Sequence, residues 1–95
     1  MIIPSKAYKE FEEAALWFVP RLAIDYPVNI KALFFMKTRR KVDLTNLLEA
    51  LDDVLVKGEC VMDDNFHIIQ SHDGSRVLYD KENPRIEVEI ERSIN

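Results

Sequence analysis

The chain contains few of the residues that build covalent cross-links, phosphate loops or membrane spans. Cys60 is the one cysteine among 95 residues, which excludes an internal disulfide and a cysteine-based zinc site. With only two glycines, the chain has no glycine-rich phosphate loop. It has no apolar run of the roughly 18 residues that a membrane helix needs, and "MIIPSK" is too short for a signal peptide. We therefore expect a cytoplasmic protein with no membrane segment.

Spacing disfavours two further kinds of enzyme site. His67 and His72 are five positions apart, which in a strand places them on opposite faces, so a paired zinc site is not expected. Ser71 and Ser75 lack the glycines of a nucleophile elbow. The carboxylates are then the main candidates for chemistry.

Length, hydrophobicity and charge describe a single domain covering residues 1–95. A chain of this length, 47% hydrophobic, forms one modest core, and association into a homodimer would add buried surface. The net charge of −4 argues against a protein that mainly coats nucleic acid. The segment "KTRRK", residues 37–41, is nevertheless a basic cluster that could meet phosphates. A solvated strand end explains this cluster equally well.

One amphipathic helix is predicted after Ser5, which we expect near its N-cap. Apolar residues recur there at spacings of three and four: Tyr8, Phe11, Ala15, Phe18, Val19 and Leu22. Pro20 should kink or end this helix. Trp17 lies off the apolar arc, so it is either a packing contact or a dimer contact, and we favour ordinary packing.

The rest of the chain combines strands with one more helix. "YPVNIKALFFMK", residues 26–37, has the pattern of a strand. A leucine-rich face predicts a helix over Leu44–Val56, capped by Gly58. "FHIIQS" and "SRVLYD" are predicted to form strands on either side of the turn "HDG". Strict alternation in "RIEVEIER", residues 85–92, predicts a half-buried strand. The predicted fold class is α+β, with two helices packed on a small mixed sheet of about four strands.

The carboxylates form two groups that the chain could bring together. Asp43 stands at the start of the second helix, where an N-cap role explains it by itself. The helix carries the chain about 18 Å, and the residues after it can span roughly 27 Å. Asp63 and Asp64 can therefore return toward Asp43. Between the two groups lies a polar stripe that is typical of a solvent face: Asn46, Glu49 and Asp53.

Carboxylates that come close repel one another unless a cation lies between them. Mg²⁺ takes one or two protein carboxylates together with waters and phosphate oxygens. Such an ion activates a water for attack on a phosphodiester. The alternative is that "MDDN", residues 62–65, is ordinary polar loop sequence.

The stretch "VDLTNLLEALDDVLVKGECVMDDNFHII" resembles the core signature of the RusA family of Holliday junction resolvases. That signature is a D-x-D-N-L element opening a helix, an aspartate within the helix, and an aspartate pair about twenty residues on. The spacing fits without a gap from Asp43 to Asp64. "SHDGSRVLYDKENPRIEVEIE" resembles the C-terminal strands of the phage-type Gram-positive branch, and "IIPSKAYKEFEE" resembles the family's first helix. The resemblance is dense over residues 28–91.

The resemblance implies a small homodimeric, Mg²⁺-dependent endonuclease that recognises four-way DNA junctions by shape, with Mn²⁺ as a substitute ion. Carried over by position, catalysis falls to Asp43 and Asp64. Asn46 and Asp53 match positions beside the ligands. The metal ligands that it implies are Asp43, Asp63, Asp64 and Thr45.

The chain departs from the family pattern at three places. Thr45 occupies the position of the family's second metal-site aspartate, and Glu49 occupies that of a common lysine. The family's N-terminal strand and basic loop also have no evident counterpart before the first predicted helix. These departures motivate an alternative function, a catalytically degenerate dimeric protein of the same fold that binds DNA junctions.

Our leading hypothesis is a crossover junction endodeoxyribonuclease, encoded by a phage or prophage. It would resolve branched DNA in recombination and repair by attack of a metal-bound water on a phosphodiester. The basic residues just before Asp43 would steer the phosphate backbone to the site: Lys37, Arg39, Arg40 and Lys41. A structural or protein-interaction domain is the third interpretation.

Overall fold

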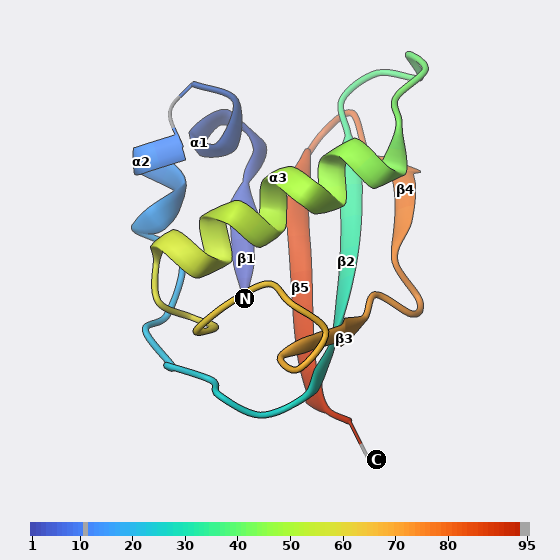
Figure 1. The fold of residues 1–95 in the computed structure, drawn as a ribbon. Helices are drawn as coiled ribbons and strands as arrows, with labels where there is room; N and C mark the ends of the chain where they lie inside the picture. The colour runs from blue at the N-terminus through green and yellow to red at the C-terminus, as the bar shows by residue number, and fades with distance from the viewer. Residues whose placement is uncertain (11, 94–95) are drawn as a thin grey trace.

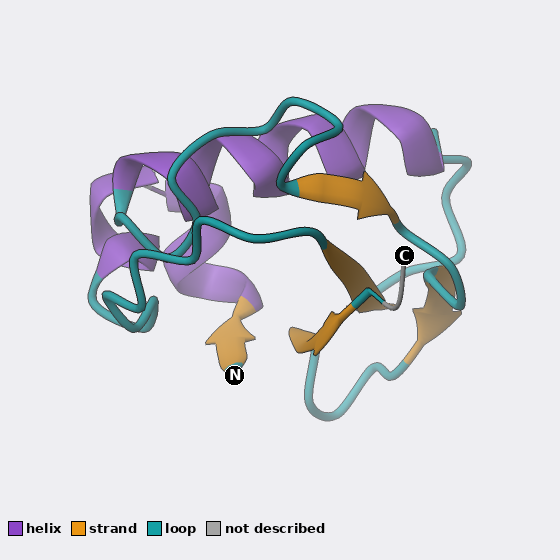
Figure 2. Cartoon of the chain, turned by 60° about the horizontal axis from the view of Figure 1, so that its bottom comes forward, coloured by secondary structure: helices purple, strands orange, loops and turns teal. Residues whose placement is uncertain are grey.

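The chain folds into two layers, with the helices on one face of a β-sheet (Figures 1 and 2). The computed structural model describes residues 1–10 and 12–93, with all of their side chains except those of residues 8–10 and 12. In chain order the elements are β1 Ile2–Pro4, α1 Ser5–Glu10, α2 Glu12–Leu16, β2 Val28–Met36, α3 Leu44–Lys57, β3 Ile69–Ser71, β4 Arg76–Tyr79 and β5 Arg85–Arg92. The α+β class is confirmed, and the described residues form five strands where about four were predicted.

Strand β2 is central because it pairs along both of its edges. On one edge β5 runs antiparallel to it, and on the other β3 and β4 both run parallel to it. The α3 crossover accounts for the parallel direction, because it returns the chain to the end at which β2 began. The predicted turn is present between β3 and β4, with Gly74 at φ 89°. Those strands pair with β2 and not with each other, so the turn does not close a hairpin.

Strand β1 was not predicted from the sequence. Ile2–Pro4 pairs antiparallel with β5 at the edge of the sheet, and Ile3 lies opposite Ile86. Ile3 is fully buried, while Pro4 ends the strand at an edge, where a missing N–H does least harm. The expectation that no strand precedes the first helix is therefore wrong. Three residues are too few to show an alternating pattern, so the strand becomes visible only through its partner.

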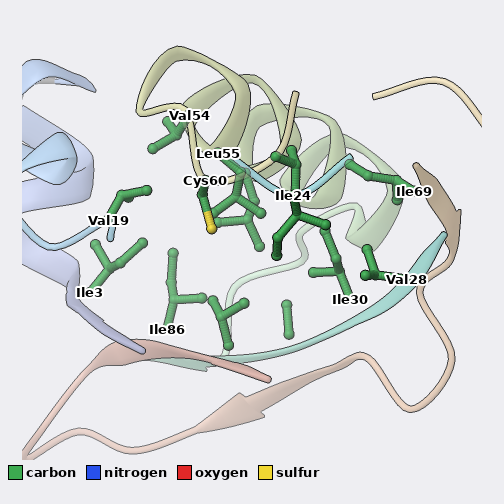
Figure 3. Close-up of a cluster of buried hydrophobic side chains, with 14 of the residues drawn as sticks. Ile3, Val19, Ile24, Val28, Ile30, Val54, Leu55, Cys60, Ile69 and Ile86 are labelled. Atoms are coloured by element: carbon green, nitrogen blue, oxygen red, sulfur yellow. The ribbon is translucent and has the colours of Figure 1, made fainter. Parts of the chain in front are cut away.

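Alternation along the two longest strands builds the core face of the sheet. Ile86 and Val88 of β5 are buried as predicted, and β2 contributes every second side chain: Val28, Ile30, Ala32 and Phe34. Helix α3 covers this face with buried leucine and valine side chains, and Figure 3 shows Val54 and Leu55 above the sheet. Cys60 lies in the same core, and burial raises the pKa of its thiol.

The first helical region is shorter than predicted. Its described helical residues end at Leu16, and the N–H groups of Phe18 and Val19 bond to carbonyls three residues earlier, the tighter pattern of a helix end. Pro20 follows directly, in agreement with its predicted role. Phe18 and Leu22 are exposed, so the predicted apolar arc does not continue through them. Its side chains at Tyr8 and Phe11 lie outside those that the structure describes.

Trp17 is the most exposed of the large apolar side chains described, at 89%. The preference for ordinary packing within the chain is therefore wrong for this residue. Together with exposed Phe18 and Leu22 it leaves an apolar patch where α2 ends. Such patches are typical of protein interaction surfaces.

Gly58 caps α3 as predicted, although its backbone is not left-handed. Its φ is −79°, and its N–H donates to the carbonyl of Val54. The left-handed residue is the next one, Glu59, at φ 57°, which forms an ion pair with Arg21. Glycine is required at position 58 by space, because a β-carbon there would stand 2.8 Å from Cγ1 of Val19.

Gly58→Ala should lower the free energy of unfolding by about 1–3 kcal/mol, the usual cost of overpacking a tight contact. Urea denaturation of the two proteins measures this difference. In a Val19→Ala background the atom that clashes is gone, so the same change should cost much less. Equal losses in both backgrounds would show that the contact with Val19 is not the cause.

Candidate functional site

A basic loop connects β2 to α3 at the upper right of Figure 1. It starts after Met36, the last residue of β2, and runs to the start of α3. All four of its predicted DNA-contacting cations are exposed: Lys37, Arg39, Arg40 and Lys41. The loop therefore presents four positive charges close together, at the end of the central strand.

Asp43 caps the N-terminus of α3. Its backbone is extended, and its Oδ1 accepts a hydrogen bond of 2.9 Å from the N–H of Thr45. This confirms the N-cap role predicted for Asp43. Thr45 and Asn46 follow in the first turn with exposed side chains. Asp43 is thus an exposed carboxylate fixed directly beside the basic loop, with its second oxygen, Oδ2, outside the capping bond.

Asp63 and Asp64 lie in the loop between α3 and β3, and both side chains are exposed. Asp63 Oδ1 accepts a hydrogen bond of 2.7 Å from the N–H of Asp64. The loop is held on both sides at the start of β2: Met62 donates to Ile24, and Val28 donates to Ile68. These bonds place the acidic loop at the end of the sheet where β2 begins.

The two carboxylate groups consequently lie toward opposite ends of α3. Asp64 is near enough to Asp52 for its charge to raise that pKa, and Asp52 is nine positions after Asp43, about 13.5 Å along a helix. Asp53 is exposed on the same half of α3 as Asp52. Among the described residues, no three His, Cys, Asp or Glu side chains are grouped so as to hold a metal ion. A metal site shared by Asp43 and Asp64 stays a prediction.

The structure adds a buried acid that was not among the predicted site residues. Asp52 is 8% exposed, the one charged side chain buried among those described. Both of its carboxylate oxygens face Nε2 of His72, at 3.1 and 2.9 Å. Burial raises the pKa of the Asp52 carboxyl, the charges of Asp64 and Asp53 raise it further, and the bond to His72 opposes them.

A sequence signal for Asp52 did exist. Asp52 comes four residues after Leu48 and three before Leu55, so it lies on the buried face of α3 and not on its polar stripe. Its partner gave no such signal, because His72 approaches from the segment after β3. Only the fold of the intervening chain joins the two.

His72→Ala should destabilise the domain by about 1–3 kcal/mol at neutral pH, because it leaves the Asp52 carboxylate buried without its partner. Chemical denaturation measures this change in the free energy of unfolding. His67→Ala is the matched control, since His67 is exposed and its removal should change little. Asp52→Asn added to His72→Ala should recover part of the loss, and no recovery would show that the buried charge is not its source.

The raised pKa of Asp52 also predicts the sign of a pH effect. In the unfolded chain this carboxyl titrates near 3.8, so the folded state is the one that holds the proton more tightly. The contribution of Asp52 to stability is therefore fully present below that pH and is lost as the pH rises through its folded pKa. Asp52→Asn should gain stability relative to wild type over this interval, measured by denaturation at several pH values. If the difference in stability between Asp52→Asn and the wild-type protein does not change with pH, the raised pKa of Asp52 is wrong.

A second ion-pair group lies where β5 begins. Arg85 binds Asp80 at 2.9 Å and Glu87 at 2.7 Å, and its guanidinium lies 3.9 Å from the ring centre of Phe35. The bond from Arg85 lowers the pKa of the Asp80 carboxyl. Arg85 is therefore engaged within the sheet, unlike the exposed cations of the basic loop.

These features describe a small α+β domain that carries an exposed cationic loop leading into a fixed carboxylate. The family model of endodeoxyribonuclease RusA matches residues 1–91, and the chain belongs to this family. The resemblance seen in the acidic motifs is thereby confirmed. Members of the family are endodeoxyribonucleases, hydrolases that cut DNA and resolve Holliday junctions. No curated protein matches the chain significantly.

No helix in the part of the chain that the structure describes is long and apolar enough to cross a membrane.

Proposed function

We propose that this protein is a Mg²⁺-dependent endonuclease that resolves branched DNA in recombination and repair. Beyond family membership, the observation that carries the proposal is that the exposed basic loop leads directly into Asp43, the exposed N-cap of α3. Cations there can bind the phosphate backbone while the carboxylate stands beside the bound phosphate. Junction recognition would depend on the shape of the DNA and on the spacing of two sites in a homodimer.

In this proposal the basic and acidic residues have separate roles. The cations of the basic loop bind and orient the backbone, and Asp43 and Asp64 supply the catalytic carboxylates. Asp63 and Thr45 are proposed as further metal ligands, and Asn46 and Asp53 as residues beside them. The fixed backbone of the N-cap holds Asp43 in one orientation, which reduces the entropy lost when a phosphate binds.

The donors present suit Mg²⁺ in type and only partly in arrangement. Exposed carboxylate oxygens are ligands that Mg²⁺ prefers, and this ion needs only one or two of them beside waters and phosphate oxygens. The described carboxylates do not, however, gather into a group of three. A bound Mg²⁺ would supply a more acidic water and neutralise charge on the phosphate.

Homodimer formation, a cytoplasmic location and a prophage origin complete the proposal. The apolar patch of Trp17, Phe18 and Leu22 supports a dimer, because it leaves large apolar side chains exposed on one chain. A small domain gains core-like burial from such association.

The test is cleavage of a synthetic four-way junction, with and without Mg²⁺, compared with a linear duplex of the same sequence. We expect symmetric cuts in the junction that require the ion, with Mn²⁺ able to replace it. If the protein cuts no junction at high concentration with either ion, the nuclease assignment is wrong.

A catalytically degenerate junction-binding protein is the second candidate, favoured by the uncharged Thr45. Its side chain is exposed in the first turn of α3, so a carboxylate fits there without disturbing the core. If the wild-type protein shifts junctions in a gel without cutting them, and Thr45→Asp cuts, the degenerate account is correct. Cutting by the wild-type protein alone would remove this candidate.

A further inference from the structure

We propose that the groove between the basic loop and β4 binds an unstacked DNA base, held by the ring of Tyr79 and the guanidinium of Arg39. The inference rests on the proposed action on branched DNA and adds to it a contact that an intact duplex does not offer. It assigns a role to Tyr79, which belongs to none of the acidic or basic motifs.

Strand register brings Tyr79 to the basic loop. In the parallel pairing of β2 and β4, Tyr79 lies beside Met36, the residue from which the loop departs. The N–H of Asp80 donates to the carbonyl of Met36 at 2.9 Å and extends that pairing. Neighbouring residues in register point to the same face of a sheet, so Tyr79 and Val77 lie on the face that α3 covers, beyond its end.

The groove that results has one basic wall and one aromatic and aliphatic wall. Thr38–Arg40 line it from the loop, Val77–Tyr79 line it from β4, and Met36 lies where the two meet. Tyr79 is 42% exposed, and the Arg39 guanidinium carbon lies 4.1 Å from its ring centre. Two flat groups, one of them cationic, are therefore already stacked at the surface.

Charge favours a nucleic acid as the ligand. The loop carries four cations within residues 37–41 and no acid. The nearest acid on β4's side, Asp80, is bound to Arg85 at 2.9 Å. A flat ligand with a phosphate attached thus meets an aromatic ring beside loop cations that form no ion pair with the described side chains, the combination by which proteins hold single-stranded DNA.

The geometry also explains a preference for branched DNA. Inside a duplex both faces of every base are covered by the neighbouring base pairs, so a side chain cannot stack on them. At a branch point a base can leave the stack, and stacking on an aromatic ring is tolerant of base identity. The groove would therefore add affinity for unpaired DNA over continuous duplex, with little sequence preference.

Fluorescence anisotropy with Ca²⁺ in place of Mg²⁺ tests the groove. The probes are labelled oligothymidine, a four-way junction and a matched duplex. Tyr79→Ala should weaken binding to the first two by about 5- to 100-fold, the range for losing one base stack, and leave duplex binding unchanged. Tyr79→Phe, which keeps the ring, should bind all three as wild type does.

Arg92→Ala is the matched control for Arg39→Ala. Arg92 also stacks on a tyrosine, Tyr26, at 4.5 Å, but at the other end of the sheet. Arg39→Ala should weaken oligothymidine binding, whereas Arg92→Ala should not. Equal effects of the two variants, or binding by Tyr79→Ala equal to wild type, would overturn the proposal.

Photocrosslinking of the wild-type protein to 5-iodouracil-substituted oligonucleotide avoids any question of variant folding. Mass spectrometry should find the crosslink on Tyr79, and crosslinks confined to other residues would refute the groove. If the protein cuts no junction yet binds oligothymidine through Tyr79, the proposed function fails and the groove stands. If it cuts junctions and Tyr79→Ala does so equally, the groove fails and the proposed function stands.

Discussion

Asp43→Asn should lower the rate of junction cleavage by about 10²- to 10⁴-fold, the usual contribution of one positioned catalytic acid–base group. It should leave the domain as stable as wild type. Asparagine is as strong an N-cap as aspartate, and its side-chain oxygen can accept the same bond from the N–H of Thr45. Single-turnover cleavage and urea denaturation measure the two properties.

This substitution separates the two roles of Asp43, because a residue that only caps the helix would tolerate it. Asp25→Asn is the control, since Asp25 is also exposed and lies before β2, away from the basic loop. Asp64→Asn should reduce cleavage as well if the acidic loop takes part in the same site. Cleavage by Asp43→Asn at the wild-type rate would remove Asp43 from the catalytic residues.

Neutralising the basic loop should weaken DNA binding by about 10²-fold or more at low salt, through changes to glutamine at four positions: Lys37, Arg39, Arg40 and Lys41. Each phosphate contact contributes about 0.9 to the slope of log affinity against log salt on duplex DNA. If all four cations make such contacts, the slope should fall by about 3 to 4. Titrations at several salt concentrations, with Ca²⁺ to prevent cutting, give both quantities.

Two cations elsewhere provide the control for this experiment. Lys31 pairs with Glu89 at 3.7 Å, and Arg92 stacks on Tyr26. Changing both to glutamine removes charge without touching the loop, so the salt slope should stay near its wild-type value. If the control lowers the slope in proportion to the charge removed, binding follows net charge and the loop is not a specific surface.

Local patterns in the sequence were sufficient to predict the elements that bury one face. The leucine spacing of residues 44–56 gave α3, and the alternation of residues 85–92 gave β5. The N-cap role of Asp43 could be predicted because capping a helix involves only the residues nearest to it in sequence. In each case the signal and the structure that it predicts lie within a few residues of each other.

The first helical region shows where a local pattern fails. Phe18, Val19 and Leu22 have helical spacing, yet the described helical residues end at Leu16 and only Val19 of these three is buried. The backbone turns toward the C-terminus of α3, where the absent side chain of Gly58 admits Val19. The spacing was compatible with a longer helix, and the close contact with a distant glycine favoured a shorter one.

For the candidate site too, some features could be predicted from the sequence and others could not. Sequence determined which residues carry charge, and the acidic motifs pointed to the RusA family, whose model matches residues 1–91. It did not determine which of those residues meet. Hydrogen bonds with residues 24 and 28 hold the acidic loop at the start of β2, while Asp43 follows the end of β2. The length of the connecting chain had allowed Asp43 and the acidic loop to come together.

By itself, then, the sequence determined the family, the main helix, the two long strands and the charged residues, because each depends on a local pattern or on residue type. Only the tertiary structure decided that β1 joins the sheet, that His72 meets buried Asp52 at 2.9 Å, and that Tyr79 stands beside Arg39. Those three outcomes depend on strand register and on the α3 crossover, which bring together residues 20 to more than 80 positions apart. No short-range pattern encodes such a pairing, since it is the burial of the whole core that selects it.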